Sequence, residues 1–293
     1  MLDETEASGE RTRAPRVAVI GGGTMGAGIA SVLLVAGHRV SLYDTREEAL
    51  GQARTRASKR AHEAVAAGRL LTTTDLEVAV PDADFVIEAV PEVLELKREI
   101  FGRLDRLAPA HAVLASNTSE LSVTAIAGAT GRPDKVVGMH WFNPPERMAL
   151  VEVVRGVHTS DATLAAAHAL AAACDKTTVT VKDRQGFVTT RALAALLLEG
   201  VRMLEEGVAS AEDIDTAVKL GLNHPMGPLE LSDYIGLDTM LLIADSMRGA
   251  IGERFLAPQT LRKLVEAGHL GRKSGRGFYD YSGRAASKGE RLP

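Results

Sequence analysis

The fold is decided by one stretch near the start of the chain, Arg16-Val17-Ala18-Val19-Ile20-Gly21-Gly22-Gly23-Thr24-Met25-Gly26. Its first five residues form a short run rich in β-branched side chains, which predicts a buried strand. Three glycines follow, and the apolar residues 25–36 predict a buried helix after them. A second strand over residues 39–43 ends at Asp44. Strand, glycine turn, helix and strand in this order predict the first βαβ unit of a parallel sheet.

The glycines have the spacing Gly21-x-Gly23-x-x-Gly26 of a dinucleotide-binding turn. Gly21 allows the tight turn, Gly23 lets the backbone approach a pyrophosphate, and Gly26 lets the helix pack on the strand. The amino end of the helix, with Thr24 and Met25, offers unpaired N–H groups and a positive dipole to the phosphates. A glycine triplet alone is a weak signal, but the strand before it and the helix after it favour dinucleotide binding over a merely structural turn.

An acidic residue at the end of the second strand indicates which dinucleotide binds. Asp44 follows the glycines by about twenty residues, where a carboxylate accepts hydrogen bonds from the adenosine ribose 2′-hydroxyl. Its charge would repel a 2′-phosphate, so NAD is favoured over NADP. Arg46, two residues further on, would soften that preference.

Strands and helices alternate through the rest of the first part of the chain. Further strands are predicted over residues 85–89, 112–115, 136–140, 150–154 and 177–181, with helices over 47–67, from Glu92 onward, and over 161–174. This alternation is typical of α/β proteins, and it predicts a Rossmann-type, doubly wound, mostly parallel sheet.

The pattern changes after Gly186, where strand-like runs give way to helical periodicity. Helices are predicted over residues 187–206, 211–220, 229–235, 237–251 and 259–267. The chain is therefore expected to consist of a disordered tail over residues 1–14, an NAD-binding domain over 15–184, and an all-helical C-terminal domain over 185–293 that binds substrate and dimerises.

Composition limits the class of protein. The chain has 293 residues, of which 45% are hydrophobic and 25% charged, and its formal net charge is −4, which argues against a nucleic-acid partner. The single cysteine, Cys174, excludes an internal disulfide. Residues 1–14 lack the apolar segment of a secretory signal, and the longest apolar runs are too short to span a bilayer. We therefore expect a cytoplasmic protein without a membrane partner, and we predict no metal site.

Two polar runs mark the expected site of chemistry, because each directly follows a predicted strand. They are Ala115-Ser116-Asn117-Thr118-Ser119 and Gly138-Met139-His140-Trp141-Phe142-Asn143-Pro144. Open α/β sheets place their ligands outside the carboxyl ends of their strands. The oxidation of an alcohol needs a base for the hydroxyl proton, and His140 suits that role because histidine ordinarily titrates near neutrality. Glu152, on the next strand, is the candidate partner that orients the imidazole.

At these residues the sequence resembles the 3-hydroxyacyl-CoA dehydrogenase family over roughly residues 15 to 283. Each motif is in the family's order and at its intervals, which makes the set far more specific than any single motif. The similar segments are Gly21–Gly28, Val86–Glu92, Ser116–Ser119, His140–Pro144 with Leu150–Val153, Asn223–Leu231, Gly236–Asp238 and Gly271–Tyr279.

The resemblance implies an NAD-dependent enzyme of the 3-hydroxybutyryl-CoA dehydrogenase type, which interconverts (S)-3-hydroxyacyl-CoA and 3-oxoacyl-CoA. It implies that His140 is the base and that Glu152 orients it. It also implies that Ser119 hydrogen-bonds the substrate oxygen at C3. Asn143 would contact cofactor or substrate, and the cofactor pocket would include Glu92, Lys97 and Lys273. In this family the helical domain forms the homodimer interface and closes over the thioester.

One position departs from the family. The family usually has asparagine where Gly186-Phe187-Val188-Thr189-Thr190-Arg191 has Thr190, which puts the substrate contacts of that position in doubt. A basic cluster, formed by Arg54, Arg56, Lys59 and Arg60, lies where family members bind the CoA moiety, although such a run is also typical of a solvated helix face.

More ordinary roles stay open for several of these residues. The run that ends at Ser119 suits turn and cap chemistry, Lys97 suits an exposed helix face, and Lys273 suits a solvated loop. Two other functions also stay open. One is a dehydrogenase on the same scaffold that acts on a carrier-protein-tethered or free hydroxy acid, and the other is a non-catalytic NAD-binding protein.

Overall fold

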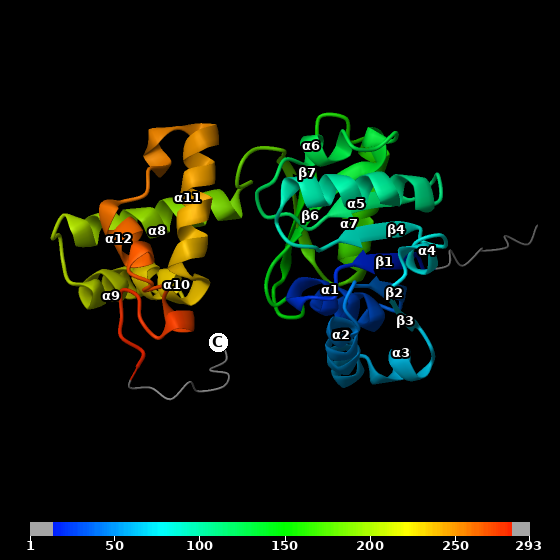
Figure 1. Cartoon of the computed structure of the whole chain (residues 1–293), viewed down its shortest axis with the longest axis horizontal. Helices are drawn as coiled ribbons and strands as arrows, with labels where there is room; N and C mark the ends of the chain where they lie inside the picture. Colours follow the sequence, from blue (N-terminus) through cyan, green and yellow to red (C-terminus); the bar gives the residue numbers. More distant parts are fainter. Residues whose placement is uncertain (1–13, 283–293) are drawn as a thin grey trace, which may run out of the picture. The chain divides into compact units, whose positions relative to one another are not determined.

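The computed structural model describes residues 14–282, which form two compact units divided between Arg184 and Gln185 (Figure 1). The first unit contains the glycine turn. The second unit contains the helices that follow Gly186. The disordered tail expected over residues 1–14 lies outside the described residues, apart from Ala14.

The first unit is built on one eight-stranded sheet with the order β3-β2-β1-β4-β5-β6-β7-β8. Neighbouring strands from β3 to β6 are parallel, β7 is antiparallel to β6, and β8 is parallel to β7. The sheet is therefore mostly parallel, as predicted. The strands are β1 (Arg16–Ile20), β2 (Arg39–Tyr43), β3 (Leu70–Thr73), β4 (Phe85–Glu88), β5 (Val113–Ser116), β6 (Val136–Trp141), β7 (Leu150–Arg155) and β8 (Thr177–Lys182).

Helices cover both faces of this sheet (Figure 1). One apolar core joins alternate residues of the strands, such as Val17, Val40 and Met139, to α1 (Thr24–Val35), α2 (Glu47–Arg60) and α7 (Asp161–Ala173). On the other face α5 (Leu94–Leu107) packs on α6 (Val123–Ala127), and α6 packs on β6. Val123 lies so close to Gly138 there that a Cβ at Gly138 would be 2.8 Å from it.

Several predicted boundaries in this unit differ from the observed ones. The helix predicted over residues 47–67 breaks at Ala61, whose φ of −125° and ψ of 43° are not helical, so that α3 (His62–Ala66) is separate. The helix expected from Glu92 begins at Leu94 because Val93 is extended. β3, α4 (Leu76–Ala79) and α6 were not predicted, because they are short and lack the fully buried apolar run of the equally short β4 and β5.

The second unit is a helical bundle. Its core is formed by residues such as Leu198, Leu229 and Met247, each less than 1% exposed. The first helix begins two residues later than predicted because Phe187 has a positive φ of 47°. The helices are α8 (Thr189–Glu205), α9 (Ala211–Gly221), α10 (Pro228–Ile235), α11 (Leu237–Ile251) and α12 (Gln259–Glu266).

A buried carboxylate fixes the loop that follows α12. Asp233 is 1% exposed, and it accepts hydrogen bonds from the backbone N–H groups of Phe278 and Tyr279 and from the hydroxyl of Tyr281. Gly277 has no side chain because a Cβ there would lie 1.9 Å from the Asp233 carboxylate. Burial raises the pKa of Asp233, and the three donors oppose that rise. These bonds hold the loop that carries Lys273 against α10.

Candidate active site

The glycine turn after β1 shows a different reason for each glycine. Gly21 has a φ of +109°, and a Cβ there would lie 2.6 Å from the carbonyl oxygen of Ala89. At Gly26 a Cβ would lie 1.7 Å from the carbonyl oxygen of Gly21. At Gly23 a Cβ would meet nothing within 4 Å of the described chain. The protein's own packing therefore does not explain Gly23, whereas the close approach of a cofactor phosphate does.

Asp44 closes onto the turn from the end of β2. Its side chain is 12% exposed, Oδ2 accepts the backbone N–H of Gly22 at 2.8 Å, and Oδ1 accepts that of Arg46 at 2.9 Å. The Arg46 Nε lies 3.6 Å from Oδ1, so Arg46 pairs with Asp44 itself. Asp44 is thus held beside the glycine turn, and its predicted contact with a ribose stays a prediction.

The basic cluster predicted on α2 does not act as one group. Arg56 holds Glu146 through Nε and Nη2, at 2.7 Å each, and donates from Nη1 to the carbonyl of Thr24 at 2.8 Å. Although burial works to raise the pKa of Glu146, the hydrogen bonds and charge of Arg56 hold it below its ordinary value. Arg56 therefore clamps α2 to the glycine turn and to the loop after β6.

The other basic side chains of α2 are exposed, namely Arg54, Lys59 and Arg60. At 100° per residue Arg54 lies nearly opposite Arg56 around the helix. Consequently only Lys59 and Arg60 share the Arg56 side of α2 with exposed charges, and a CoA phosphate there would meet two cations rather than four.

His140 and Glu152 are direct partners across the β6–β7 pair. The antiparallel register places them opposite each other, with His140 Nδ1 2.8 Å from Glu152 Oε2. His140 is 5% exposed and Glu152 is fully buried. An ionised carboxylate only accepts hydrogen bonds, so Nδ1 carries the proton and Nε2 carries the lone pair. This is the tautomer that a histidine base needs.

Neighbouring residues brace this pair at the carboxyl edge of the sheet. The ring of Phe142 lies 4.4 Å from that of His140 between centroids. Asn117, after β5, accepts the backbone N–H of Trp141 at 2.9 Å and donates its own N–H to the carbonyl of Glu88 at 2.7 Å. The ends of β4, β5 and β6 are thereby held together. In the sequence Asn117 stands within a polar run that follows a strand, and nothing local marks it as the residue that joins these strand ends.

A second buried pair lies under the same edge. Glu88 and Lys97 are both fully buried, with Nζ 2.7 Å from Oε1. Glu88 also accepts the hydroxyl of Ser116 at 2.6 Å and the N–H of Val90 at 2.7 Å. Burial raises the pKa of Glu88, and Lys97, Ser116 and Val90 all oppose that rise. Lys97 is thus not the exposed helix lysine that its sequence setting also allowed.

Glu92 joins this pair to the loop that carries Ser119. Its Oε2 lies 3.3 Å from the Lys97 Nζ, and its Oε1 accepts the hydroxyl of Thr118 at 2.5 Å and the backbone N–H of Ser119 at 2.7 Å. Ser119 itself is exposed. Glu92 and Lys97 therefore position Ser119, whatever contact they also make with a cofactor.

The remaining predicted site residues lie in loops or in the second unit. Asn143 is exposed in the loop after β6. Thr190 is partly buried in the first turn of α8, and Lys273 lies in the loop after α12. The Lys273 Nζ is 2.5 and 2.6 Å from the two carboxylate oxygens of Asp238, and these bonds lower the pKa of Asp238.

Residues 14–282 also bear on metal and membrane binding. They contain no group of three or more histidine, cysteine, aspartate or glutamate side chains placed to hold a metal ion. Within the same residues, no helix has both the length and the apolar character that a membrane crossing requires.

Comparison with known proteins identifies the family. Residues 16–184 match the NAD-binding domain of 3-hydroxyacyl-CoA dehydrogenase, and residues 186–281 match its C-terminal domain. A probable 3-hydroxybutyryl-CoA dehydrogenase of Bacillus subtilis is 45% identical over 279 residues, covering 91% of this chain and 97% of the relative. The human mitochondrial hydroxyacyl-coenzyme A dehydrogenase is 42% identical over 294 residues, covering 94% of each.

A solved structure agrees with these matches. The (S)-3-hydroxybutyryl-CoA dehydrogenase of Ralstonia eutropha superposes with a TM-score of 0.88 at 39% identity, covering 92% of this chain and 99% of that one. Together with the glycine turn and the pair across β6 and β7, these matches confirm the resemblance seen in the sequence. The chain belongs to the 3-hydroxyacyl-CoA dehydrogenase family, with that family's NAD-binding domain followed by its C-terminal domain.

Proposed function

We propose that this NAD-dependent enzyme interconverts (S)-3-hydroxyacyl-CoA and 3-oxoacyl-CoA with short acyl groups, and that His140 is its general base and acid. The observation that carries the proposal is the 2.8 Å contact between His140 Nδ1 and the fully buried Glu152. That contact fixes both the tautomer and the orientation of the imidazole.

In the oxidation direction His140 Nε2 accepts the proton of the C3 hydroxyl. The imidazole then becomes a cation, and the negative charge of Glu152 next to it stabilises that cation at low solvent exposure. In the reduction direction His140 returns the proton to the C3 oxygen. General acid–base catalysis of this kind contributes about 10²–10⁴-fold to a rate.

Ser119, Asn143 and Thr190 would position the substrate around this base. The hydroxyl of Ser119 would donate to the C3 oxygen. Glu92 accepts the backbone N–H of Ser119 at 2.7 Å and so fixes the position from which this side chain extends. Asn143 would contact substrate or cofactor. Thr190 offers one short hydroxyl where the family has a longer amide, so it would mainly set the room around the acyl group.

NAD would be held by the glycine turn and by the acid at the end of β2. Gly21, Gly23 and Gly26, with Thr24 and Met25 at the helix start, would receive its pyrophosphate, and Asp44 would accept the ribose hydroxyls. Glu92, Lys97 and Lys273 would also contribute to NAD binding. When bound, NAD supplies the acceptor for the hydride that leaves C3.

The proposal is tested against two other substrate classes, carrier-protein-linked and free hydroxy acids. NADH oxidation should be measured with acetoacetyl-CoA, with acetoacetyl-acyl carrier protein and with free acetoacetate. We expect the highest kcat/KM with acetoacetyl-CoA. A higher kcat/KM with the carrier-linked substrate would show that the acyl group is not carried by CoA. A higher kcat/KM with acetoacetate would show that the substrate is not a thioester. No turnover with any of them, despite NADH binding, would favour a non-catalytic role.

The helical unit would also form a homodimer. It exposes large apolar side chains at Leu220, Leu222 and Leu242, which are 80%, 65% and 70% exposed within one chain. Apolar surface of this kind is typical of interfaces. Light scattering after size-exclusion chromatography should give the mass of two chains, and the L220D/L222D variant should give the mass of one. A monomeric wild type would refute the dimer.

A further inference from the structure

Gly28, in α1, is a glycine that the dinucleotide-binding turn does not require. The turn needs only the three glycines that precede it, and a glycine inside a helix is less stable there than alanine. A Cβ at Gly28 would lie 2.8 Å from the Cδ of Pro145 and 2.9 Å from the Nη2 of Arg56. The missing side chain therefore makes room for the loop after β6 and for an arginine of α2.

Arg56 joins the same loop to the start of α1 with all three nitrogens of its guanidinium group. Nε and Nη2 each donate to the carboxylate of Glu146 at 2.7 Å, and Nη1 donates to the carbonyl of Thr24 at 2.8 Å. The Glu146 side chain is 4% exposed. Bidentate pairs of this kind are both strong and specific in direction. We call Gly28, Arg56 and Glu146 the clamp.

The loop that the clamp holds contains a compact turn. The backbone N–H groups of Arg147 and Met148 donate to the carbonyl of Pro144 at 3.0 and 3.1 Å. The Nζ of Lys176 donates to the carbonyls of Pro145 and Met148 at 2.8 and 2.9 Å. The turn is thus fixed to α1, to α2 and to the residue that precedes β8.

Asn143 lies between this turn and the end of β6. At the end of β6 the backbone N–H of Trp141 donates to Asn117 at 2.9 Å, and the turn begins at Pro144. Only Phe142 and Asn143 stand between these two anchored points. The backbone at Asn143 is therefore fixed from both directions, and its exposed side chain extends from a defined position.

We propose that the clamp positions Asn143 in the active site. Arg56 and Glu146 would hold the loop in a fixed place relative to the glycine turn, so that Asn143 meets the ligand bound there. This inference rests on the proposed function, in which Asn143 contacts substrate or cofactor. Arg56 and Glu146 act only through Asn143, so they are positioning residues. A displacement of about 1 Å in such a group can lower a rate by about a hundredfold.

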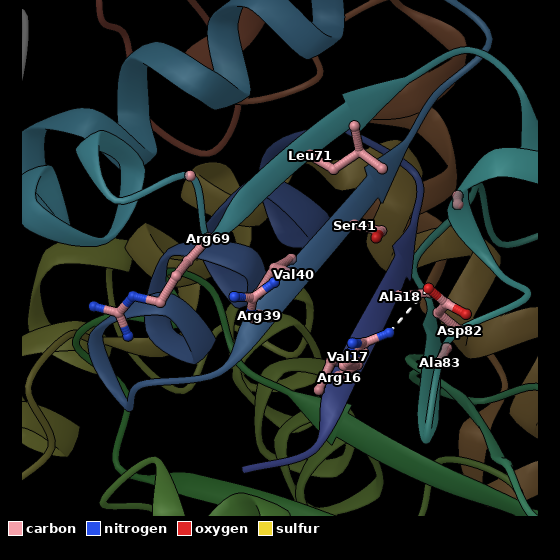
Figure 2. Close-up of a pocket in the computed structure, with 12 residues that line it drawn as sticks. Arg16, Val17, Ala18, Arg39, Val40, Ser41, Arg69, Leu71, Asp82 and Ala83 are labelled. Atoms are coloured by element: carbon pink, nitrogen blue, oxygen red, sulfur yellow. Dashed lines mark hydrogen bonds and ion pairs between the residues drawn. The ribbon is translucent and has the colours of Figure 1, made fainter. Parts of the chain in front are cut away.

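The test begins with the variant R56Q/E146Q, which removes both charges of the clamp and leaves no buried charge unpaired. R16Q/D82N is the matched control. The Arg16 side chain is 34% exposed, against 30% for that of Arg56, and it pairs with Asp82 at 2.9 Å. Figure 2 shows this control pair beside a cavity, and Arg16 lies at the opposite end of β1 from the glycine turn.

The kinetic readout is kcat/KM for acetoacetyl-CoA at saturating NADH. It should fall at least about tenfold in R56Q/E146Q, because a charged pair no longer holds the loop. In a chain that already carries Asn143→Ala, the same double substitution should cost no more than about twofold, since changes that act through one residue are not additive. R16Q/D82N should leave kcat/KM unchanged in both backgrounds.

Three kinetic results would overturn the proposal. In the first, R56Q/E146Q leaves kcat/KM unchanged. In the second, it costs as much with Asn143→Ala as without it, which would mark a general structural effect. In the third, R16Q/D82N lowers kcat/KM as far as R56Q/E146Q does.

Hydrogen exchange tests the clamp without relying on turnover. The amides of Arg147 and Met148 should exchange at least about tenfold faster in R56Q/E146Q than in the wild type or in R16Q/D82N. Mass spectrometry of a peptide that covers residues 142–149 measures this. A wild type that reduces no acetoacetyl substrate would refute the proposed function, whereas unchanged exchange in R56Q/E146Q would refute the clamp itself.

Gly28→Ala repeats the test without altering a charge. Gly51→Ala is its control, because Gly51 lies in α2 and a Cβ there would meet nothing within 4 Å of the described chain. Alanine favours a helix over glycine, so Gly51→Ala should raise the Tm and leave the exchange of the loop unchanged. Gly28→Ala should instead speed exchange over residues 142–149. A Gly28→Ala variant with a raised Tm and the exchange of the wild type would contradict the clamp.

Discussion

Two carboxylates at the carboxyl edge of the sheet each pair with a basic side chain, yet the two pairs differ in what they can do. Glu152 meets His140 across β6 and β7 at 2.8 Å, and Glu88 meets Lys97 between β4 and α5 at 2.7 Å. All four residues are at most 5% exposed. The pairs are thus alike in burial and distance, and they differ in the chemistry of the base.

An imidazole has two nitrogens, so one can be fixed by Glu152 while the other exchanges a proton with a substrate. The ammonium group of Lys97 has only donors, and Glu88, Glu92 and the carbonyl of Val90 surround it. Glu88 in turn is occupied by Ser116 and by the N–H of Val90 as well. The first pair therefore has the chemistry that the proposed proton transfer needs, and the second holds the loop of Ser119 in place through Glu92.

The largest expected effect comes from breaking the second pair. Lys97→Met leaves Glu88 buried without its cation, which should lower the free energy of unfolding by about 3–5 kcal/mol at pH 8. Trp141, the only tryptophan, is buried in the first unit and reports its unfolding in urea. E88Q/K97M should recover part of the loss because no charge is left buried. An unchanged free energy of unfolding in Lys97→Met would show that the Glu88–Lys97 pair does not stabilise the first unit.

The same variant should show how the loss depends on pH. Burial raises the pKa of Glu88, and without Lys97 it should rise further. The folded chain then keeps a proton that the unfolded chain has released, so stability is greatest below the ordinary glutamate pKa. It falls as pH rises through the folded pKa. The loss in Lys97→Met should therefore be smaller at pH 5 than at pH 8, and an equal loss would contradict a charged Glu88 as its cause.

The next effect comes from removing the charge of the first pair. Glu152→Gln keeps the shape of the side chain and loses a charged hydrogen bond, worth about 1.5–3 kcal/mol. We expect kcat to fall by roughly tenfold to a hundredfold, with little change in NADH binding. The control is Asp105→Asn, which removes a carboxylate of the same unit that pairs with Arg132 at 2.7 Å. An equal loss of kcat in that control would mark the effect as general.

A third carboxylate, Asp44, is held mainly by backbone N–H groups, and its ion pair with Arg46 is longer than the other two pairs. Asp44 contacts backbone N–H groups, and the nearest cation, Arg46, is 3.6 Å away. Asp44→Ala should lower kcat/KM with NADH and narrow the gap to NADPH by about tenfold, the change expected from one contact of ~1.4 kcal/mol. Equal use of NADPH by the wild type would show that Arg46 controls the pocket instead.

Thr190 should give the smallest effect, because it offers a single neutral hydroxyl, whereas each of the two pairs carries charge. Thr190→Ala should lower kcat by no more than about tenfold. Thr190→Asn should keep activity on short acyl thioesters and shift the preference among bulkier ones. Steady-state kinetics with a short and a long 3-oxoacyl-CoA measure both. A thousandfold loss in Thr190→Ala would make Thr190 a primary catalytic residue and would point to a different substrate.

Of the two pairs, only His140 with Glu152 could be predicted from the sequence. His140 and Glu152 stand on consecutive predicted strands, so their proximity could be predicted, although not the antiparallel register that makes them opposite. Lys97 stands in a charged helix, which is typical of a solvated face. Its burial depends on the ion pair with Glu88 at the end of β4, and Glu88 is held in turn by Ser116 of β5. No local pattern encodes those contacts. Only the family resemblance marked Lys97 at all.

The fold was predicted in outline for a related reason. Long periodic segments and the glycine turn depend on local sequence. The sheet and the helical unit could therefore be predicted from them. The missed β3 is four residues long and half exposed, so it lacks a periodic signal. The pairing of Arg56 with Glu146 spans 90 residues. This contact depends on the loop after β6, which the sequence did not place. Because Arg56 binds Glu146, it is not available to the basic cluster that was expected to bind CoA.

His140→Ala removes the side chain that is proposed to transfer the proton in this NAD-dependent enzyme. We predict that kcat for reduction of acetoacetyl-CoA falls by about 10²–10⁴-fold. The dissociation constant of NADH, followed by its fluorescence, should stay nearly unchanged, because the glycine turn and Asp44 are intact. Near-normal turnover in His140→Ala would contradict the account.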